Sequence, residues 1–215
     1  MTGSYIDLYC ERTGPEYWSE PVNALTNIGF LISAIAVTRI IYKVSRTRSF
    51  DGVHWLFNGL IYVIGIGSWL FHTHATRWAM LSDIIPIAIF ILLYVWFALR
   101  RFAAAPRLVC LGCGAAVLGV ATAVPALTGY GGGAYIAALV FMIATGGYLC
   151  FKRTNPGGSA LLWAAAVFSA SLLFRTLDIP VCTILGTGTH FVWHLLNAVV
   201  LFLVVRALIL HGKRT

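Results

Sequence analysis

The chain has 215 residues, of which 60% are hydrophobic and only 10% are charged, and its formal net charge is +8. A soluble globular domain carries about 25% charged residues, so the composition excludes an ordinary soluble domain and predicts a protein that crosses a membrane several times. A large positive charge is also typical of proteins that bind nucleic acid, so the placement of the basic residues decides its meaning.

Seven segments are each apolar over about 20 residues, the length that a helix needs to cross a bilayer. They are residues 22–43, 53–73, 78–99, 107–124, 134–151, 159–177 and 186–210. Short connections join them. The sequence therefore predicts an all-α fold, an integral membrane bundle of seven transmembrane helices. We expect a single domain over 1–215, with an outer tail at 1–21, the bundle at 22–210 and a cytoplasmic tail at 211–215.

The basic residues are unevenly divided between the two ends of the predicted helices. The end that carries the N-terminal tail has only Arg12, Arg77 and Arg175, and every other Lys and Arg falls at the opposite end. Ends rich in Lys and Arg face the cytoplasm, which predicts an outer N-terminus and a cytoplasmic C-terminus. The net charge is then a topology signal, and no nucleic-acid partner is expected. Short loops and the lack of a targeting signal fit a bacterial inner membrane with its outer side in the periplasm.

The seventh predicted helix opens with HFVWH, a costly sequence to place in lipid. His190 and His194 lie four residues apart and therefore share one face of a helix. Ionisable residues inside a membrane usually mark a functional site. The ordinary alternative is a pair of histidines that only hydrogen-bond between helices.

Further polar residues approach the same outer end from the second and third predicted helices. The second helix ends with Ser68 and His72 on one face, and Asp83 lies near the start of the third. A catalytic zinc site has three protein ligands and an open fourth position, so His72 and the pair in the seventh helix are the predicted ligands. His74 is the alternative third ligand, but it lies on another face of the helix, and we favour His72.

Three blocks of the sequence resemble the alkaline ceramidase family, part of a larger group of seven-span membrane proteins that includes the adiponectin receptors. They are YCERTGPEYWSEPVNALTNIGFLIS, GSWLFHTHATRWAMLSDIIP and FRTLDIPVC followed by HFVWHLL. The fourth and fifth helices match only as apolar segments. The resemblance implies a zinc-dependent amidohydrolase that cleaves the N-acyl amide bond of ceramide, or of a related membrane lipid, to a fatty acid and a sphingoid-type amine.

The resemblance also implies roles for the residues beside the zinc ligands. Zinc makes water acidic enough to ionise near neutral pH, and Asp83 is expected to accept its proton and return it to the leaving amine. Ser68 is expected to donate a hydrogen bond to the developing oxyanion or to orient the water. The structural alternatives are pairing of Asp83 with Arg77, Arg175 or a histidine and simple helix packing at Ser68.

In the outer tail the resemblance implies a calcium ion. Matching by motif gives Glu11 and Glu20, with the carbonyl group of Tyr9, as its ligands, and oxygen ligands suit calcium. The chain departs from the family pattern here. The expected Asp is displaced by one residue to Asp7, and Thr13 stands where the family has Asn. A solvated acidic tail is the ordinary alternative.

The resemblance further pairs Cys10 with Cys182, and both cysteines are predicted to lie in an outer compartment, where disulfides persist. Asp178 lies in the third block. We expect it to support the loop or the tail, for instance by pairing with Arg175 or Arg12, and not to act in catalysis.

Two functional classes fit these observations. The first is a zinc-dependent lipid amidase, and the alternative is a receptor or membrane-sensing protein with a structural zinc ion. Asp83 and Ser68 favour the enzyme because a structural zinc site needs neither of them. A transporter is a weaker third interpretation, since the sequence has no inverted repeat.

Overall fold

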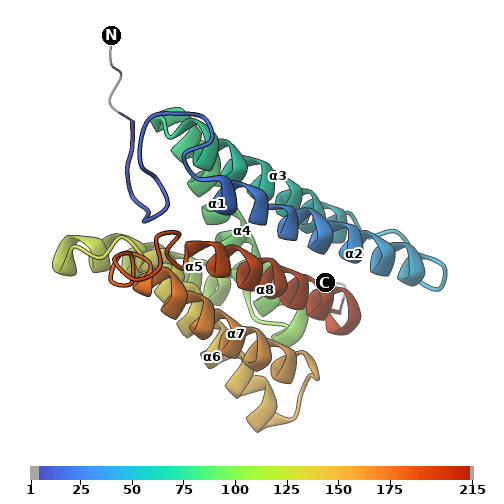
Figure 1. Cartoon of the computed structure of the whole chain (residues 1–215). Helices are drawn as coiled ribbons and strands as arrows, with labels where there is room; N and C mark the ends of the chain where they lie inside the picture. The colour runs from blue at the N-terminus through green and yellow to red at the C-terminus, as the bar shows by residue number, and fades with distance from the viewer. Residues whose placement is uncertain (1–4, 214–215) are drawn as a thin grey trace. The chain divides into compact units, whose positions relative to one another are not determined.

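The computed structural model describes residues 5–213, which form eight α-helices (Figure 1). The helices are α1 (Pro21–Thr26), α2 (Ile28–Ser45), α3 (Gly52–His74), α4 (Arg77–Ala103), α5 (Arg107–Thr128), α6 (Gly133–Lys152), α7 (Gly157–Leu177) and α8 (His190–His211). With α1 and α2 taken as one span, seven of these segments are long and apolar enough to cross a membrane. The predicted all-α fold with seven spanning helices is confirmed, and the chain is an integral multi-pass membrane protein.

Two spans differ from the prediction, the first because it is interrupted and the last because it begins later, and each difference has a local cause. The first span is interrupted at Asn27, whose side-chain amide donates to the carbonyl oxygen of Asn23 at 2.9 Å and so competes with the helical pattern. The last helix begins at His190, four residues later than predicted. Gly188 before it adopts a left-handed φ of 60°, and an added Cβ there would meet a carboxylate oxygen of Asp178 at 2.1 Å.

The chain divides into two compact units. The first unit consists of Met1–Ile87 and Val167–Phe202, and the second of Ala88–Ala166 and Leu203–Thr215. Every residue of the predicted sites lies in the first unit. The single domain over 1–215 stays a prediction, and residues 1–4 and 214–215 of its two tails lie outside the described residues.

Close helix contacts build the first unit. The hydroxyl group of Ser33 in α2 donates to the carbonyl oxygen of Ala198 in α8 at 2.6 Å. Helices α3 and α4 approach still more closely, because a Cβ added to Gly67 would lie 2.0 Å from the carbonyl oxygen of Ser82. Glycine at this position therefore lets the backbones of α3 and α4 meet, one residue away from Ser68 and Asp83.

The second unit is held by side-chain hydrogen bonds to helix carbonyl groups. The hydroxyl group of Tyr94 in α4 donates to the carbonyl oxygen of Val204 in α8 at 2.9 Å. The side-chain amide of Asn155, just before α7, donates to the carbonyl oxygen of His211 at 3.1 Å. These bonds satisfy polar groups that would otherwise face apolar surroundings.

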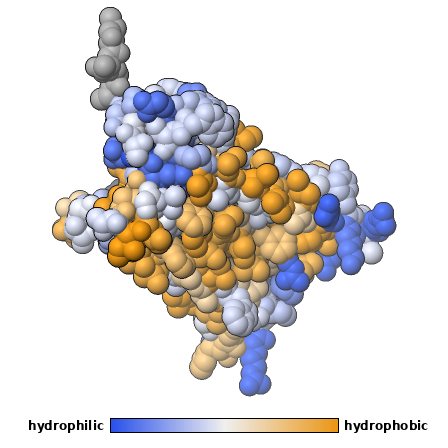
Figure 2. All heavy atoms as spheres, viewed as in Figure 1, coloured by the Kyte–Doolittle hydropathy of each residue, from blue (hydrophilic) through white to orange (hydrophobic). Residues whose placement is uncertain are grey.

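The surface of the protein is strongly apolar along the helices, whereas hydrophilic residues gather over the N-terminal tail and at some helix ends (Figure 2). Large apolar side chains such as Leu25, Ile28 and Ile32 are about 60% exposed. Soluble monomers rarely expose apolar patches of this extent. The exposed apolar surface is the one expected for helices that face lipid.

The tail is covalently attached to the segment before α8. Cys10 and Cys182 form a disulfide with their Cα atoms 5.4 Å apart, which confirms the predicted pair. The bond closes a loop of 172 residues. In the chain-entropy account of disulfides, closing a loop of this length strongly reduces the conformational entropy of the unfolded chain and so stabilises the folded protein.

Replacing both cysteines by serine should lower the free energy of unfolding by about 2–5 kcal/mol. Thermal unfolding of the purified protein in detergent would show this as a lower melting temperature, and a reductant should reproduce the loss in the unmodified protein. The matched control is Cys113→Ser, which changes a half-buried cysteine outside the disulfide. Equal melting temperatures for the double variant and the unmodified protein would contradict the prediction.

Candidate metal centre

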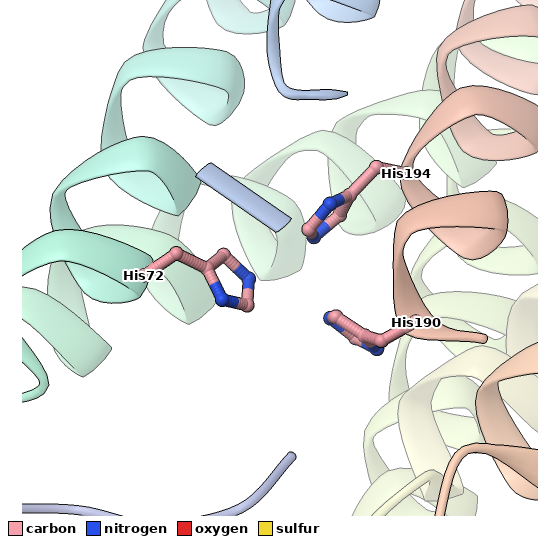
Figure 3. Close-up of side chains that lie close together, drawn as sticks. All are labelled: His72, His190 and His194. Carbon is pink, nitrogen blue, oxygen red and sulfur yellow. The ribbon is translucent and has the colours of Figure 1, made fainter. Parts of the chain in front are cut away.

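Three histidines converge in the first unit, His72 from α3 and His190 and His194 from α8 (Figure 3). Each offers a ring nitrogen, and these three atoms all lie within 4.8 Å of one another. All three side chains are buried, with at most 1% of each residue exposed. The structure thus brings together the three residues that the sequence predicts as metal ligands.

Four ring nitrogens of this group have no hydrogen-bond partner among the described residues. They are Nε2 of His72, both nitrogens of His190 and Nε2 of His194. A buried polar group without a partner costs about 1–3 kcal/mol, and several such costs in one place need a compensating ligand. Three imidazoles with free nitrogens are a donor set that suits zinc, so the residues fit this ion.

Two hydrogen bonds fix which ring nitrogens are free. Nδ1 of His72 lies 2.6 Å from a carboxylate oxygen of Glu20, which can only accept, so His72 carries a proton on Nδ1. Nδ1 of His194 lies 3.1 Å from the hydroxyl group of Thr26, whose single proton is directed to the carbonyl oxygen of Val22 at 2.8 Å. Thr26 therefore accepts from His194. In both rings Nε2 keeps its lone pair, the arrangement that metal-binding histidines show.

His190 is positioned by stacking and by its backbone. Its ring stacks on that of Tyr9 from the tail, with centroids 3.7 Å apart, and on that of Trp193 at 5.1 Å. Its backbone N–H donates to a carboxylate oxygen of Asp178 at 2.9 Å, and the N–H of Thr189 donates to the same oxygen at 2.7 Å. Asp178 thus caps the first turn of α8 and fixes the start of the helix that carries two of the histidines.

His74 does not take part in this cluster. Its Nδ1 lies 3.0 Å from the hydroxyl group of Thr73, and its ring packs edge-on against Tyr17 and Trp78 at 5.2 Å. The ring is half-buried. Of the two histidines that the sequence offered from the second span, the structure places His72 with the α8 pair.

Ser68 and Asp83 lie beside the histidines and are also buried, with 1% and 7% of their surfaces exposed. The polar neighbours of Asp83 are His72, Ser68 and Arg175. The side chains of Ser68 and Asp83 lie close enough to interact with each other, but Oδ1 of Asp83 makes no hydrogen bond of good geometry within residues 5–213. A carboxylate and a hydroxyl group therefore lie next to the three histidines.

The carboxylates predicted to bind calcium have other partners in the tail. The two oxygens of Glu11 accept the backbone N–H groups of Val22 and Asn23 at 2.7 and 2.8 Å, at the start of α1. Glu20 accepts from His72, from the side chain of Asn23 at 3.0 Å and from Arg12. The calcium site stays a prediction.

The carbonyl oxygen of Tyr9 accepts the backbone N–H of Arg12 at 3.2 Å. Asp7 and Thr13 are exposed.

The two neighbouring glutamates differ in acidity. Burial raises the pKa of Glu11 above its ordinary value, despite its backbone hydrogen bonds. Burial also opposes ionisation of Glu20, but hydrogen bonds from His72 and Asn23 and the charge of Arg12 outweigh it and hold the pKa of Glu20 below its ordinary value. Glu20 is therefore a carboxylate suited to accept a hydrogen bond from a metal-binding histidine.

Sequence reasoning missed the partners that orient the histidines. Glu20 and Thr26 were not assigned to His72 and His194, and Asp178 was expected to pair with arginines, whereas its hydrogen bonds go to backbone N–H groups of the tail and of α8. The only local signal was an acidic residue between the last two spans. The resemblance suggested that Asp178 supports the tail, but it did not indicate that its partner there is the backbone N–H of Cys10, 168 residues away, at 2.9 Å.

A family model described as Ceramidase matches residues 2–213 of the chain, nearly its whole length. The chain belongs to the ceramidase family. Membership in the ceramidase family makes the protein a membrane-embedded hydrolase that acts on amide bonds and has a lipid substrate. The resemblance drawn from the three sequence blocks is confirmed. A search of curated proteins found no match to this ceramidase-family chain.

Proposed function

We propose that this ceramidase-family protein is a zinc-dependent amidase that cleaves the N-acyl amide bond of ceramide, or of a closely related lipid, to a fatty acid and a sphingoid-type amine. One observation carries the proposal. Buried, unpartnered nitrogens of His72, His190 and His194 converge next to an unpartnered carboxylate oxygen of Asp83 and the hydroxyl group of Ser68. Together they supply a metal site, a base and a hydrogen-bond donor.

In this proposal His72, His190 and His194 hold the ion through ring nitrogens. When bound, zinc supplies Lewis acidity that activates water and polarises the amide carbonyl group. Glu20 and Thr26 hold the Nδ1 protons of two of the histidines and so aim the opposite nitrogens toward the ion.

The chain's own acid–base group is Asp83. Its carboxylate accepts the proton that the attacking water loses and then donates it to the nitrogen of the leaving amine, so that amine and acid both leave as stable products. The hydroxyl group of Ser68 donates a hydrogen bond to the substrate oxygen as negative charge develops on it. Burial of both residues strengthens these interactions because little water is present to compete.

The receptor alternative with a purely structural zinc ion is not favoured. A structural site needs neither a buried carboxylate nor a buried hydroxyl group beside the ligands, yet Asp83 and Ser68 both lie there, close enough to interact with each other. Oδ1 of Asp83 has no hydrogen-bond partner in the described part of the chain and would lower stability unless a substrate or water occupies the space next to it.

We further propose that the site faces the outer side, the periplasm if the protein lies in a bacterial inner membrane. The support is the distribution of basic residues, because the site adjoins the N-terminal tail and Lys and Arg concentrate at the other ends of the spans. A disulfide in the tail agrees with an oxidising compartment.

The direct test is to incubate purified protein with a panel of N-acyl lipids that vary in head group and acyl length, with zinc or with a chelator, and to measure products by mass spectrometry. We expect equal amounts of fatty acid and free amine from ceramide or a close analogue, and no products after chelation. Protein that binds zinc but hydrolyses no member of the panel would favour the receptor instead.

A further inference from the structure

The side chain of Arg12 is the buried cation of the N-terminal tail, with 0% of its surface exposed. Its guanidinium group forms an ion pair with Glu20 and donates to the carbonyl oxygen of Gly14 at 3.0 Å and to that of His72 at 2.8 Å. These contacts join the middle of the tail, the end of the tail and the last turn of α3.

A calcium ion in this tail would need several oxygens directed at one point. Instead, Glu11 accepts two backbone N–H groups, and Glu20 accepts from Arg12, His72 and Asn23. The guanidinium group already contacts a carboxylate and two carbonyl groups, which are the kinds of ligand that calcium takes. The geometry fits a fixed organic cation better than a metal ion.

We infer that Arg12 is the resident cation of the tail, filling the role of a divalent ion, and that it positions His72 for metal binding. It reaches His72 from two directions. It holds the carboxylate of Glu20 that accepts from Nδ1 of His72, and it holds the backbone carbonyl group of His72 itself. A planar group with several fixed donors can make both contacts at once, which lysine cannot reproduce fully.

Arg12 is therefore a positioning residue and does not contact the reacting atoms. The effect on His72 rests on the proposed function, because it assumes that His72 is a metal ligand. The replacement of calcium by Arg12 does not rest on it. The two parts can be tested separately.

The calcium part is tested on the unmodified protein. In zinc-containing buffer its melting temperature should be the same with and without added calcium, because no site in the tail is left for the ion. A melting temperature that rises with calcium would overturn this part and would support the predicted calcium site.

The positioning part is tested by Arg12→Gln and Arg12→Lys, with Arg77→Gln as the matched control, an exposed arginine at the start of α4. Cobalt(II) replaces zinc as the probe, because its visible spectrum reports the geometry of the ligands. Arg12→Gln should weaken cobalt affinity by about 10–100-fold, the usual effect of losing a partner of a ligand, and should alter the spectrum. Arg12→Lys should restore part of the affinity, and Arg77→Gln should match the unmodified protein.

Arg12→Gln that folds and binds cobalt with unchanged affinity and spectrum would overturn the positioning role. A double variant with Glu20→Gln guards against a general effect on folding. The single variants Arg12→Gln and Glu20→Gln are measured alongside it. If Arg12 acts largely through Glu20, the double variant should bind cobalt only slightly more weakly than the single variant with the lower affinity. Losses of binding free energy that add fully in the double variant would contradict this route. If the unmodified protein binds neither cobalt nor zinc, the proposed metal site fails, whereas the calcium comparison still tests Arg12.

Discussion

Asp83→Asn should lower the rate of amide hydrolysis by about 10²–10⁴-fold, the usual contribution of a positioned acid–base group. The change keeps the shape of the side chain and removes the group that accepts the proton. Bound zinc should remain, because Asp83 is not among the three proposed ligands. Metal analysis and product formation, measured on the same preparation, separate the two effects.

The control for this variant is Glu16→Gln, which removes a carboxylate from an exposed position in the tail. Ser68→Ala should have a smaller effect than Asp83→Asn, about 10-fold to 10³-fold, as expected for one hydrogen-bond donor to the oxyanion. Hydrolysis at the unmodified rate in Asp83→Asn would show that another group is the base. Loss of zinc from this variant would show instead that Asp83 supports the metal.

The second large effect is expected for the histidines of α8. His190→Ala and His194→Ala should each lose most of the bound zinc and, with it, nearly all activity. The affinity should fall by more than about 100-fold, because removing even an outer partner of a ligand costs about 10–100-fold. Zinc content after dialysis against a weak chelator gives the measurement, and a melting temperature taken in parallel shows whether the variants are folded.

His74→Ala is the matched control for these variants, since it removes a histidine two residues from His72 that lies outside the cluster. It should keep its zinc. An unchanged zinc content in both α8 variants would refute the metal site. Loss of zinc from His74→Ala would indicate that His74 is a ligand after all.

The sequence by itself determined the spans and the type of chemistry. Runs of about 20 apolar residues can cross a bilayer only as helices, because each backbone N–H and C=O must find a partner within its own segment. Helical periodicity then placed His190 with His194 and Ser68 with His72 on shared faces. The high cost of ionisable residues in lipid marked these faces as functional, and the family blocks supplied the disulfide pair.

The tertiary structure decided which faces meet and what supports them. Periodicity assigns residues to a face of one helix but does not specify the neighbour of that face. The choice of His72 over His74 therefore depended on how α3 packs against α8. The Glu20–His72 contact spans 52 residues and the Arg12–His72 contact spans 60, and no local pattern encodes either. The resemblance implied a calcium site in the tail, which stays a prediction. Folding brings the carboxylates of this tail to backbone N–H groups, to a histidine and to a buried arginine, because unpaired charges cannot be buried at low cost.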